Sequence, residues 1–233
     1  MIKTLNSKIE GNLNKFDEIL GRRCTRDGVI DEKQYLEAPI KILWILKEPN
    51  SPDDDIYDMR KGIATLLDGD VIHKDWAKTF TALAYSTYGI LNNKTEEYYP
   101  KIEGNAPVVE SLQKTAFINV KKLPGKSFAI KKELRDFYSR YNLLLKEQIE
   151  IINPDVLIFG GSFDLFEKEW FEIFGSKLYE DISKTHIQEY QYGDKLLLST
   201  YHPGQWKIER HIYCNSIIDS VMKWKENQKY VGI

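Results

Sequence analysis

Residues 42–50 have the sequence ILWILKEPN, in which an unbroken apolar run is followed at once by Lys47, Glu48 and Pro49. Because the run does not alternate between apolar and polar residues, it predicts a β-strand that is buried on both faces. Further runs of this kind occur along the chain, at residues 116–120, 156–159 and 196–200. Such strands are typical of parallel sheets that are covered by helices.

Segments with helical spacing lie between and after these runs, at residues 74–91, 127–152, 163–174 and 205–227. Strands that are joined by long helical crossovers pair in parallel and place helices on both faces of the sheet. We therefore predict an α/β fold, a three-layer α/β/α sandwich with a four-stranded, mainly parallel central sheet. Residues 1–233 are expected to form a single domain, in which residues 1–40 are an N-terminal helical cover.

The composition excludes several classes of protein. Lys and Arg total 33 against 35 Asp and Glu, so the net charge is -2 and a histone-like DNA-binding protein is excluded. The two cysteines, Cys24 and Cys214, form no CxxC pair for zinc or an iron–sulfur cluster, and we expect neither a metal nor a cofactor. Because there is no signal-peptide pattern and no apolar run of bilayer length, we expect a cytoplasmic monomer without a membrane partner.

Glu48 lies where a ligand site is expected in this kind of fold. In open α/β sheets, ligands bind beyond the carboxyl ends of the strands, where the connections diverge to opposite faces. Glu48 directly follows a predicted strand, and Pro49 restricts the backbone after it. The carboxylate suits an electrostatic catalyst, and the structural alternative is a salt-bridged or capping glutamate in a βα loop.

Two further polar residues follow predicted strands. His202 precedes Pro203 and Gly204, close to the expected start of a helix, where a histidine donor favours developing negative charge. The alternative is a histidine that binds a loop carbonyl. Asn119 lies near the end of the second predicted strand, where a buried amide either hydrogen-bonds within the protein or binds a ligand.

Basic residues gather in two places that would flank the same strand ends. Between residues 121 and 135 there are six basic residues and one acidic residue, a local charge of 6 − 1 = +5. Lys207, Arg210 and His211 follow His202. Solvated helix faces explain either group alone, but two groups on one rim favour contacts to a phosphate backbone. The candidate DNA-backbone contacts are Lys121, Lys122, Lys126, Gln205 and Lys207.

The order of these segments resembles that of the uracil-DNA glycosylase superfamily. The matching pieces are ILWILKEPN, AFINVKKLPGK, NPDVLIFGG and LLLSTYHPGQW, which together span about residues 42 to 206. The resemblance implies that Glu48 orients water and stabilises the sugar cation. It also implies that Asn119 reads the pyrimidine edge and that His202 binds the carbonyl oxygen of the departing base. Pro49, Asn50 and Tyr57 would complete the base site, with Tyr57 or Trp206 stacking on an extruded base.

The resemblance has departures that keep a second function open. Leu46 stands where the family begins its first motif with glycine, Lys47 follows it, and Gly204 replaces the serine that is common after His-Pro. The first hypothesis is a DNA-repair glycosylase that hydrolyses the N-glycosidic bond of a damaged or deaminated base in DNA. The alternative is a non-catalytic module that binds a nucleotide or single-stranded nucleic acid. A third reading, a small-molecule hydrolase on a flavodoxin-like sheet, lacks support because Ser162 has no motif-defined base.

Overall fold

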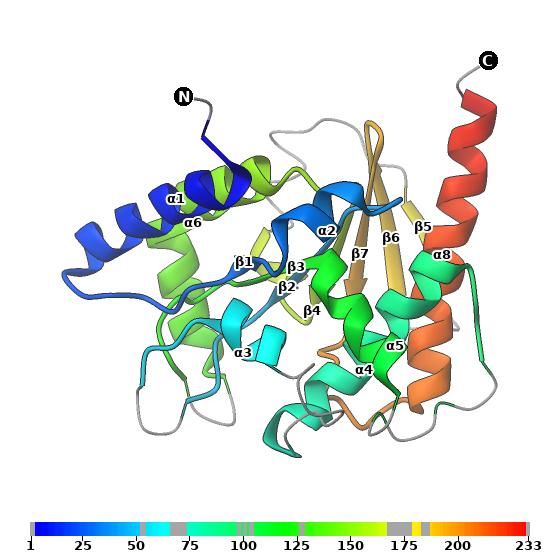
Figure 1. Ribbon diagram of the computed structural model, residues 1–233, viewed down its shortest axis with the longest axis horizontal. Helices are drawn as coiled ribbons and strands as arrows, with labels where there is room; N and C mark the ends of the chain where they lie inside the picture. The colour runs from blue at the N-terminus through cyan, green and yellow to red at the C-terminus, as the bar shows by residue number, and fades with distance from the viewer. Residues whose placement is uncertain are drawn as a thin grey trace.

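The computed structural model describes residues 3–51, 55–65, 74–96, 99, 102, 105–125, 129–166, 179–182 and 187–231. Within these ranges, seven strands form one sheet (Figure 1), namely β1 (Gly28–Val29), β2 (Ile42–Leu46), β3 (Thr115–Asn119), β4 (Val156–Gly160), β5 (Tyr179–Ile182), β6 (Ile187–Tyr192) and β7 (Lys195–Thr200). Their spatial order is β1-β3-β2-β4-β7-β6-β5.

The apolar runs predicted as strands form the centre of the sheet, as β3, β2, β4 and β7 in that spatial order. All neighbouring pairs among them are parallel. Leu46 at the end of β2 pairs with Asn119 at the end of β3, and Gly160 pairs with Thr200. The carboxyl ends of these strands therefore meet at one edge of the sheet, and this edge carries the candidate site.

The predicted four-stranded sheet is wrong in strand number, because antiparallel strands extend the centre at both sides. β1 pairs with β3, while β6 pairs with β7 and β5 pairs with β6. β1 has only two residues and β6 reads IQEYQY, so neither contains an apolar run. A turn signal for β6 is present in the sequence, since Gly193, at φ +56°, and Asp194 connect β6 to β7. The sheet is therefore mixed.

Helices cover both faces of this sheet (Figure 1). They are α1 (Leu5–Leu20), α2 (Glu32–Glu37), α3 (Met59–Thr65), α4 (Lys74–Asn92), α5 (Ala106–Glu110), the 3-10 turn η1 (Ser111–Lys114), α6 (Lys131–Ile152) and α8 (Arg210–Val231). The predicted helices at 127–152 and 205–227 begin later than expected, at Lys131 and Arg210. The helix predicted at 163–174 lies mostly outside the described residues. The α/β class with helices on both sides is confirmed.

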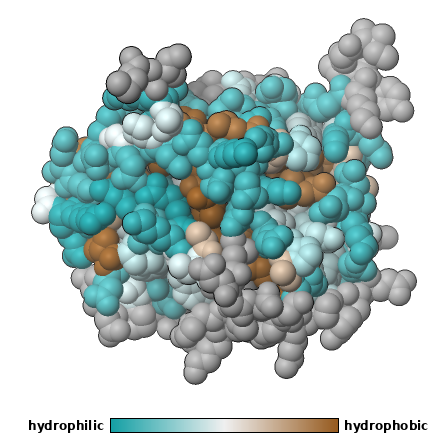
Figure 2. Space-filling model, viewed as in Figure 1, coloured by the Kyte–Doolittle hydropathy of each residue, from teal (hydrophilic) through white to brown (hydrophobic). Residues whose placement is uncertain are grey.

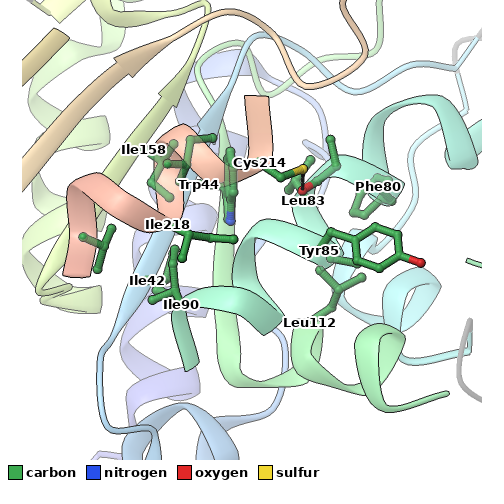
Figure 3. Close-up of a cluster of buried hydrophobic side chains, with 14 of the residues drawn as sticks. Ile42, Trp44, Phe80, Leu83, Tyr85, Ile90, Leu112, Ile158, Cys214 and Ile218 are labelled. Atoms are coloured by element: carbon green, nitrogen blue, oxygen red, sulfur yellow. Dashed lines mark hydrogen bonds between the residues drawn. The ribbon is translucent and has the colours of Figure 1, made fainter. Parts of the chain in front are cut away.

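The central strands are buried on both faces, as their sequences indicate. Ile42 and Trp44 pack against α4 and α8, and Figure 3 shows this core. Leu43 and Ile45 point to the other face, where they pack against α1 and α6. Each of these side chains is fully buried, which contributes about 1.5–3 kcal/mol per aliphatic residue. The β2 strand is thus fixed in register, and so is the segment that follows it.

The N-terminal segment is more than a helical cover, because it also supplies an edge strand. Asn12 on α1 donates from its side-chain amide to the Leu144 carbonyl of α6 at 3.1 Å. Glu32 caps α1 by accepting the backbone N–H groups of Leu5 and Asn6, each at 3.0 Å. Gly28 in β1 then pairs with β3. The segment is therefore joined to the sheet as well as packed on it.

Among the described helices, none combines the length and the apolar character needed to cross a bilayer. The face shown in Figure 2 is largely hydrophilic, with small, scattered hydrophobic groups.

Candidate functional site

The connections of the central strands diverge at their carboxyl ends. The chain leaves β2 and β7 toward α4 and α8, which share one core. It leaves β3 toward α6 and leaves β4 toward Phe163 and Phe166, which belong to the opposite core. Such a divergence marks the usual ligand position in an open α/β sheet. We call the residues at this edge, Lys47, Glu48, Asn119, Gly161 and His202, the strand-end site.

The segment after β2 is held against the segment after β3. The backbone N–H of Lys121 donates to the Lys47 carbonyl at 2.9 Å, and that of Gly125 donates to the Pro49 carbonyl at 2.8 Å. Asn50 and Gly125 form an isolated bridge. Pro49 is buried and Asn50 is exposed, so of these two predicted base-binding residues only Asn50 presents its side chain to solvent.

Glu48 reaches the expected edge but is bound within the protein. Its carboxylate pairs with Lys121 Nζ at 3.0 Å, and its side chain is only 6% exposed. It also lies against Gly125, where a Cβ atom would be 2.1 Å from Glu48 Cδ. Lys121 binds Glu133 at 2.8 Å as well. Burial lowers the pKa of Lys121, but the hydrogen bonds that it donates to Glu133 and Glu48 outweigh this effect, and the pKa is raised.

Asn119 is buried at the end of β3 and is 1% exposed. Its backbone N–H donates to Asp27 Oδ2 at 2.8 Å, which fixes the strand end. Its side-chain Nδ2 donates to the thioether of Met59 at 2.9 Å. A thioether sulfur is a weak acceptor, so this amide makes a weaker bond than a carbonyl partner would give it.

Lys122 is not a surface residue, which corrects its assignment as a DNA-backbone contact. Its side chain and that of Asp27 are both 0% exposed, and Nζ lies 2.7 Å from Asp27 Oδ2. Gln148 of α6 completes the group, accepting from Lys122 Nζ at 2.7 Å and donating to Asp27 Oδ1 at 2.8 Å. A fully enclosed ammonium group cannot reach a phosphate. Instead, the network joins the segments around β1, β3 and α6.

His202 follows β7 and holds a defined tautomer. Its Nδ1 accepts the backbone N–H of Gly204 at 3.1 Å, so the proton of the neutral ring is on Nε2. Burial, followed by the charges of Lys47 and Lys78, lowers the pKa of His202 to about 4. The imidazole is therefore neutral at pH 7. No described residue binds Nε2, which leaves an N–H donor for a ligand.

Lys47 is a site residue that the sequence analysis treated only as a departure from the family motif. A Cβ atom at Gly161 would lie 3.1 Å from Lys47 Cε, 3.3 Å from Lys47 Nζ and 3.3 Å from the backbone nitrogen of His202. Lys47 thus extends across the end of β4 toward His202. The available signal was its place directly after a buried strand, opposite the Gly160-Gly161 pair.

Tyr57 lies beside the site in a loop that the N-terminal helix supports. Its half-buried ring packs at 6.2 Å from Trp76, and burial raises its pKa to about 12, with a further contribution from Asp27. Its carbonyl accepts the backbone N–H of Arg26 at 3.1 Å. The ring is therefore a packed, protonated phenol.

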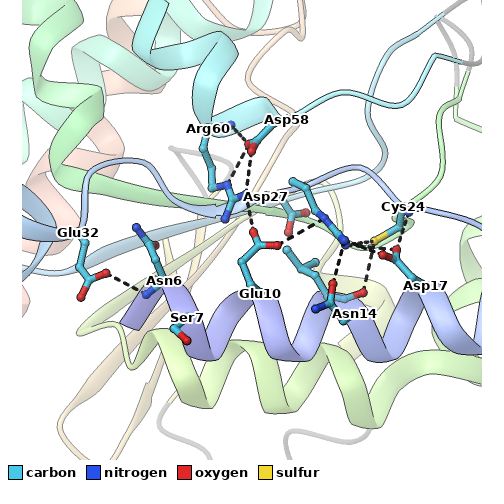
Figure 4. Close-up of polar contacts among 12 residues, drawn as sticks. Asn6, Ser7, Glu10, Asn14, Asp17, Cys24, Asp27, Glu32, Asp58 and Arg60 are labelled. Carbon is cyan, nitrogen blue, oxygen red and sulfur yellow. Dashed lines mark hydrogen bonds and ion pairs between the residues drawn. The ribbon is translucent and has the colours of Figure 1, made fainter. Parts of the chain in front are cut away.

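A polar network ties α1 to this loop, as Figure 4 shows. Arg60 Nη2 lies 2.6 Å from Glu10 Oε1 on α1. Arg26 Nη2 lies 2.5 Å from Asp17 Oδ2, also on α1. Sequence reasoning missed this network, since its members are widely spaced ordinary charged residues.

The other predicted DNA-backbone residues have different surroundings. Both ends of the Gln205 side chain are used within its own turn, since Oε1 accepts from Ile208 N at 2.8 Å and Nε2 donates to Ile208 O at 2.9 Å. Lys207 is exposed, with Nζ 5.3 Å from the centre of the Tyr201 ring. Trp206 is 85% exposed, so it cannot form the wall of an enclosed pocket. Lys126 lies outside the described residues.

Ser162 Oγ is buried and donates to the Ile45 carbonyl at 2.7 Å, which leaves no free nucleophile there. Within the described ranges, no group of three or more His, Cys, Asp or Glu side chains is arranged to hold a metal ion. A cavity of about 360 Å³ lies near the C-terminal end of α4, and its lining includes Tyr85, Tyr88 and Tyr99. It is separate from the strand-end site.

Comparison with known proteins adds no family to this geometry. No protein-family model matches the chain, and the search of curated proteins found no significant match. The likeness to the uracil-DNA glycosylase superfamily is therefore one of short motifs in a shared order. A function for the strand-end site is therefore argued from its chemistry and from these short motifs.

Proposed function

We propose that the strand-end site binds a nucleobase of DNA and hydrolyses its N-glycosidic bond. One observation carries this proposal: the neutral His202 ring, whose Nδ1 is occupied by the Gly204 N–H, keeps an Nε2–H donor, and the charge of Lys47 acts on the same ring. A fixed donor next to a cation stabilises negative charge that develops on a bound group. The short motifs that resemble the glycosylase superfamily supply the substrate class.

The charges at the site match those that the reaction creates. Breaking a sugar–base bond leaves positive charge on the sugar and negative charge on the base. Glu48 provides a fixed negative group, and His202 with Lys47 provides a donor and a cation. β4 separates β2 from β7, so the two groups follow strands about 10 Å apart, two strand spacings. In this proposal the base lies toward His202 and Lys47, and the sugar lies toward the Glu48 side of β2.

Asn119 and the exposed residues after β7 have supporting roles in this proposal. Asn119 reads the base edge by exchanging its weak bond to Met59 for a base carbonyl. Trp206, at 85% exposure, stacks on a base at the protein surface, and the exposed Lys207 contacts the phosphate backbone. Trp206 and Lys207 are exposed after β7, whereas Asn119 is 1% exposed and has to turn its amide away from Met59 to reach a base.

A non-catalytic binding module is the second candidate, and the ion pair of Glu48 favours it. A glutamate that is 6% exposed and bound to Lys121 is poorly placed to activate water. In that case the same residues recognise a nucleobase without cleaving its bond to the sugar.

Base release from labelled oligonucleotides separates the two candidates. Single- and double-stranded DNA with uracil, hypoxanthine or another damaged base is incubated with stoichiometric protein and then treated with alkali. We expect strand breaks with wild-type protein and a loss of about 100-fold or more in His202→Gln, the scale for removing one such donor. The matched control is His211→Gln, which replaces a half-buried histidine of α8 whose Nδ1 lies 3.4 Å from Glu209, and it should keep wild-type activity. Intact strands on every substrate, with binding that weakens steeply with salt, would support the binding module instead.

A further inference from the structure

Lys47 differs from the other lysines at this edge of the sheet. Lys121 binds Glu48 and Glu133, and Lys122 binds Asp27. Lys47 is half-buried, yet no carboxylate of the described residues lies within ion-pair distance of it. A partly desolvated cation without a counter-ion is costly, because charge is normally paired when it leaves water. Such a residue is suited to receive negative charge from a ligand.

The direction of Lys47 assigns it to the His202 side of the site. Its Nζ lies 3.3 Å from the position that a Cβ atom on Gly161 would occupy, so the absence of a side chain there leaves room for Lys47. Gly161 adopts φ +72°. The next residue, Glu48, points the opposite way, toward Gly125 and Lys121. Lys47 and Glu48 therefore place opposite charges on the two sides of β2.

We propose that Lys47 is a catalytic residue that binds the departing base together with His202, and that it restricts the substrates to oxo-bases that leave as anions. This inference rests on the proposed glycosidic activity and assigns the charge that the activity needs. His202 contributes a directed hydrogen bond, and Lys47 contributes the positive charge that a neutral imidazole lacks.

The step is a heterolytic hydrolysis. The bond between C1′ and the base nitrogen breaks, and its electron pair goes to the base, where it is delocalised onto the carbonyl oxygen. Water adds to C1′ of the sugar cation and forms the C1′–OH of an abasic site. The proton that this water loses ends on the base nitrogen once the anion has left Lys47, so atoms and charge balance.

The charge of Lys47 predicts which bases are released. Uracil and hypoxanthine carry carbonyl oxygens and leave as anions, which an ammonium group attracts. N-alkylated purines such as 7-methylguanine already carry a positive charge and leave as neutral molecules. Lys47 therefore favours the first class and disfavours the second.

The test is the leaving-group dependence of single-turnover base release. Wild-type protein and Lys47→Met are compared on duplexes with uracil, 5-fluorouracil or 7-methylguanine. We expect Lys47→Met to lose about 100-fold on uracil, and less on 5-fluorouracil because fluorine already stabilises the anion. Release of 7-methylguanine should not fall. An equal loss on uracil and 5-fluorouracil, or no loss, overturns the role of Lys47.

Controls distinguish a failure of this inference from a failure of the proposed glycosidic activity. Lys78→Met also removes a cation that lowers the pKa of His202, but it should keep the wild-type ratio between uracil and 5-fluorouracil. If the wild-type protein releases no base at all, the proposed function fails and the inference fails with it. If the wild-type protein is active and the ratio in Lys47→Met is unchanged, only the inference fails. Thermal unfolding checks that Lys47→Met keeps the wild-type fold. Lys47→Gln, which also removes the charge, is the second variant if it does not.

A readout that does not require activity tests the same placement. In an NMR titration, Lys47→Met should raise the pKa of His202 above the wild-type value of about 4, while burial keeps it below 6.5. An unchanged pKa of His202 would mean that the ammonium group does not lie beside the imidazole, and this outcome also overturns the inference.

Discussion

Lys47 and Glu48 are neighbours in the chain, yet their side chains leave β2 toward different strands. Glu48 turns to the β3 side, where Gly125 has no side chain to block it. Lys47 turns to the β4 side, where Gly161 leaves the same kind of space. Two glycines thus decide the direction of two opposite charges, and the polarity of the strand-end site follows from them.

Replacement of Gly125 tests whether this glycine makes room for the Glu48 carboxylate. A Cβ atom would lie 2.1 Å from Glu48 Cδ and would displace the carboxylate from Lys121. We expect Gly125→Ala to lower the free energy of unfolding in urea by about 1–3 kcal/mol. Gly11→Ala is the control, because nothing lies within 4 Å of its Cβ position and alanine favours a helix. Equal stability of Gly125→Ala and wild-type protein would contradict the packing of Glu48 on Gly125.

The pKa of His202 makes stability depend on pH. Its pKa falls from 6.5 to about 4 on folding, chiefly because the ring is buried. Between these values the unfolded chain binds more protons than the folded protein, so stability is present above pH 6.5 and is lost as pH falls toward 4. In His202→Gln, the decline over this window should be shallower in urea unfolding. The same slope in both proteins would show that His202 is not buried in its neutral form.

The sequence predicted the edge on which Glu48, Asn119 and His202 lie, because each follows a strand of a parallel sheet. It could not predict the partner of each side chain. Lys121 and Lys122 are adjacent and equally basic, but only the structure distinguishes the lysine that binds Glu48 from the one enclosed with Asp27. Partner choice depends on residues far away in the chain, and the charge pattern carries no information about them.

At the scale of elements, apolar runs were a sufficient signal for the buried parallel strands and an insufficient one for the outer antiparallel strands. β2, β3, β4 and β7 are continuous apolar segments, and all were predicted. β1 has two residues, and β6, which lies between β7 and the edge strand β5, is largely polar because an antiparallel strand can leave one face open to solvent. Helix starts were missed by several residues. α8 begins after the turn that Gln205 closes, since the side chain of Gln205 accepts the backbone N–H groups of Lys207 and Ile208.

The buried network of Lys122, Asp27 and Gln148 connects the segments around β1, β3 and α6. Its loss should therefore lower the stability of the whole fold. Lys122→Met leaves the Asp27 carboxylate buried without its cation, which costs about 3–5 kcal/mol. Lys132→Met, which breaks an exposed pair with Asp136 on α6, should cost less than about 0.5 kcal/mol. Urea unfolding measures both. Similar costs for the two variants would contradict a fully enclosed ion pair at Lys122.

At the scale of the whole molecule, the N-terminal segment is part of the folded unit. It supplies β1 and buries Ile9, Leu13, Phe16 and Val29 against the α6 side of the sheet. At about 1.5–3 kcal/mol each, these side chains contribute an amount comparable with the net stability of a typical domain. Removal of residues 1–40 should therefore abolish cooperative thermal unfolding and the near-ultraviolet circular dichroism signal. A truncated chain that unfolds at the wild-type temperature would contradict this assignment.

The central claim is that His202 presents a neutral imidazole with an Nε2–H donor at the strand-end site. Long-range proton–nitrogen NMR of ¹⁵N-histidine-labelled protein measures this directly. The account predicts an unprotonated Nδ1 and a protonated Nε2 at pH 7, with no conversion to imidazolium until the pH approaches about 4. A proton on Nδ1, or an imidazolium ring at pH 6, would contradict it.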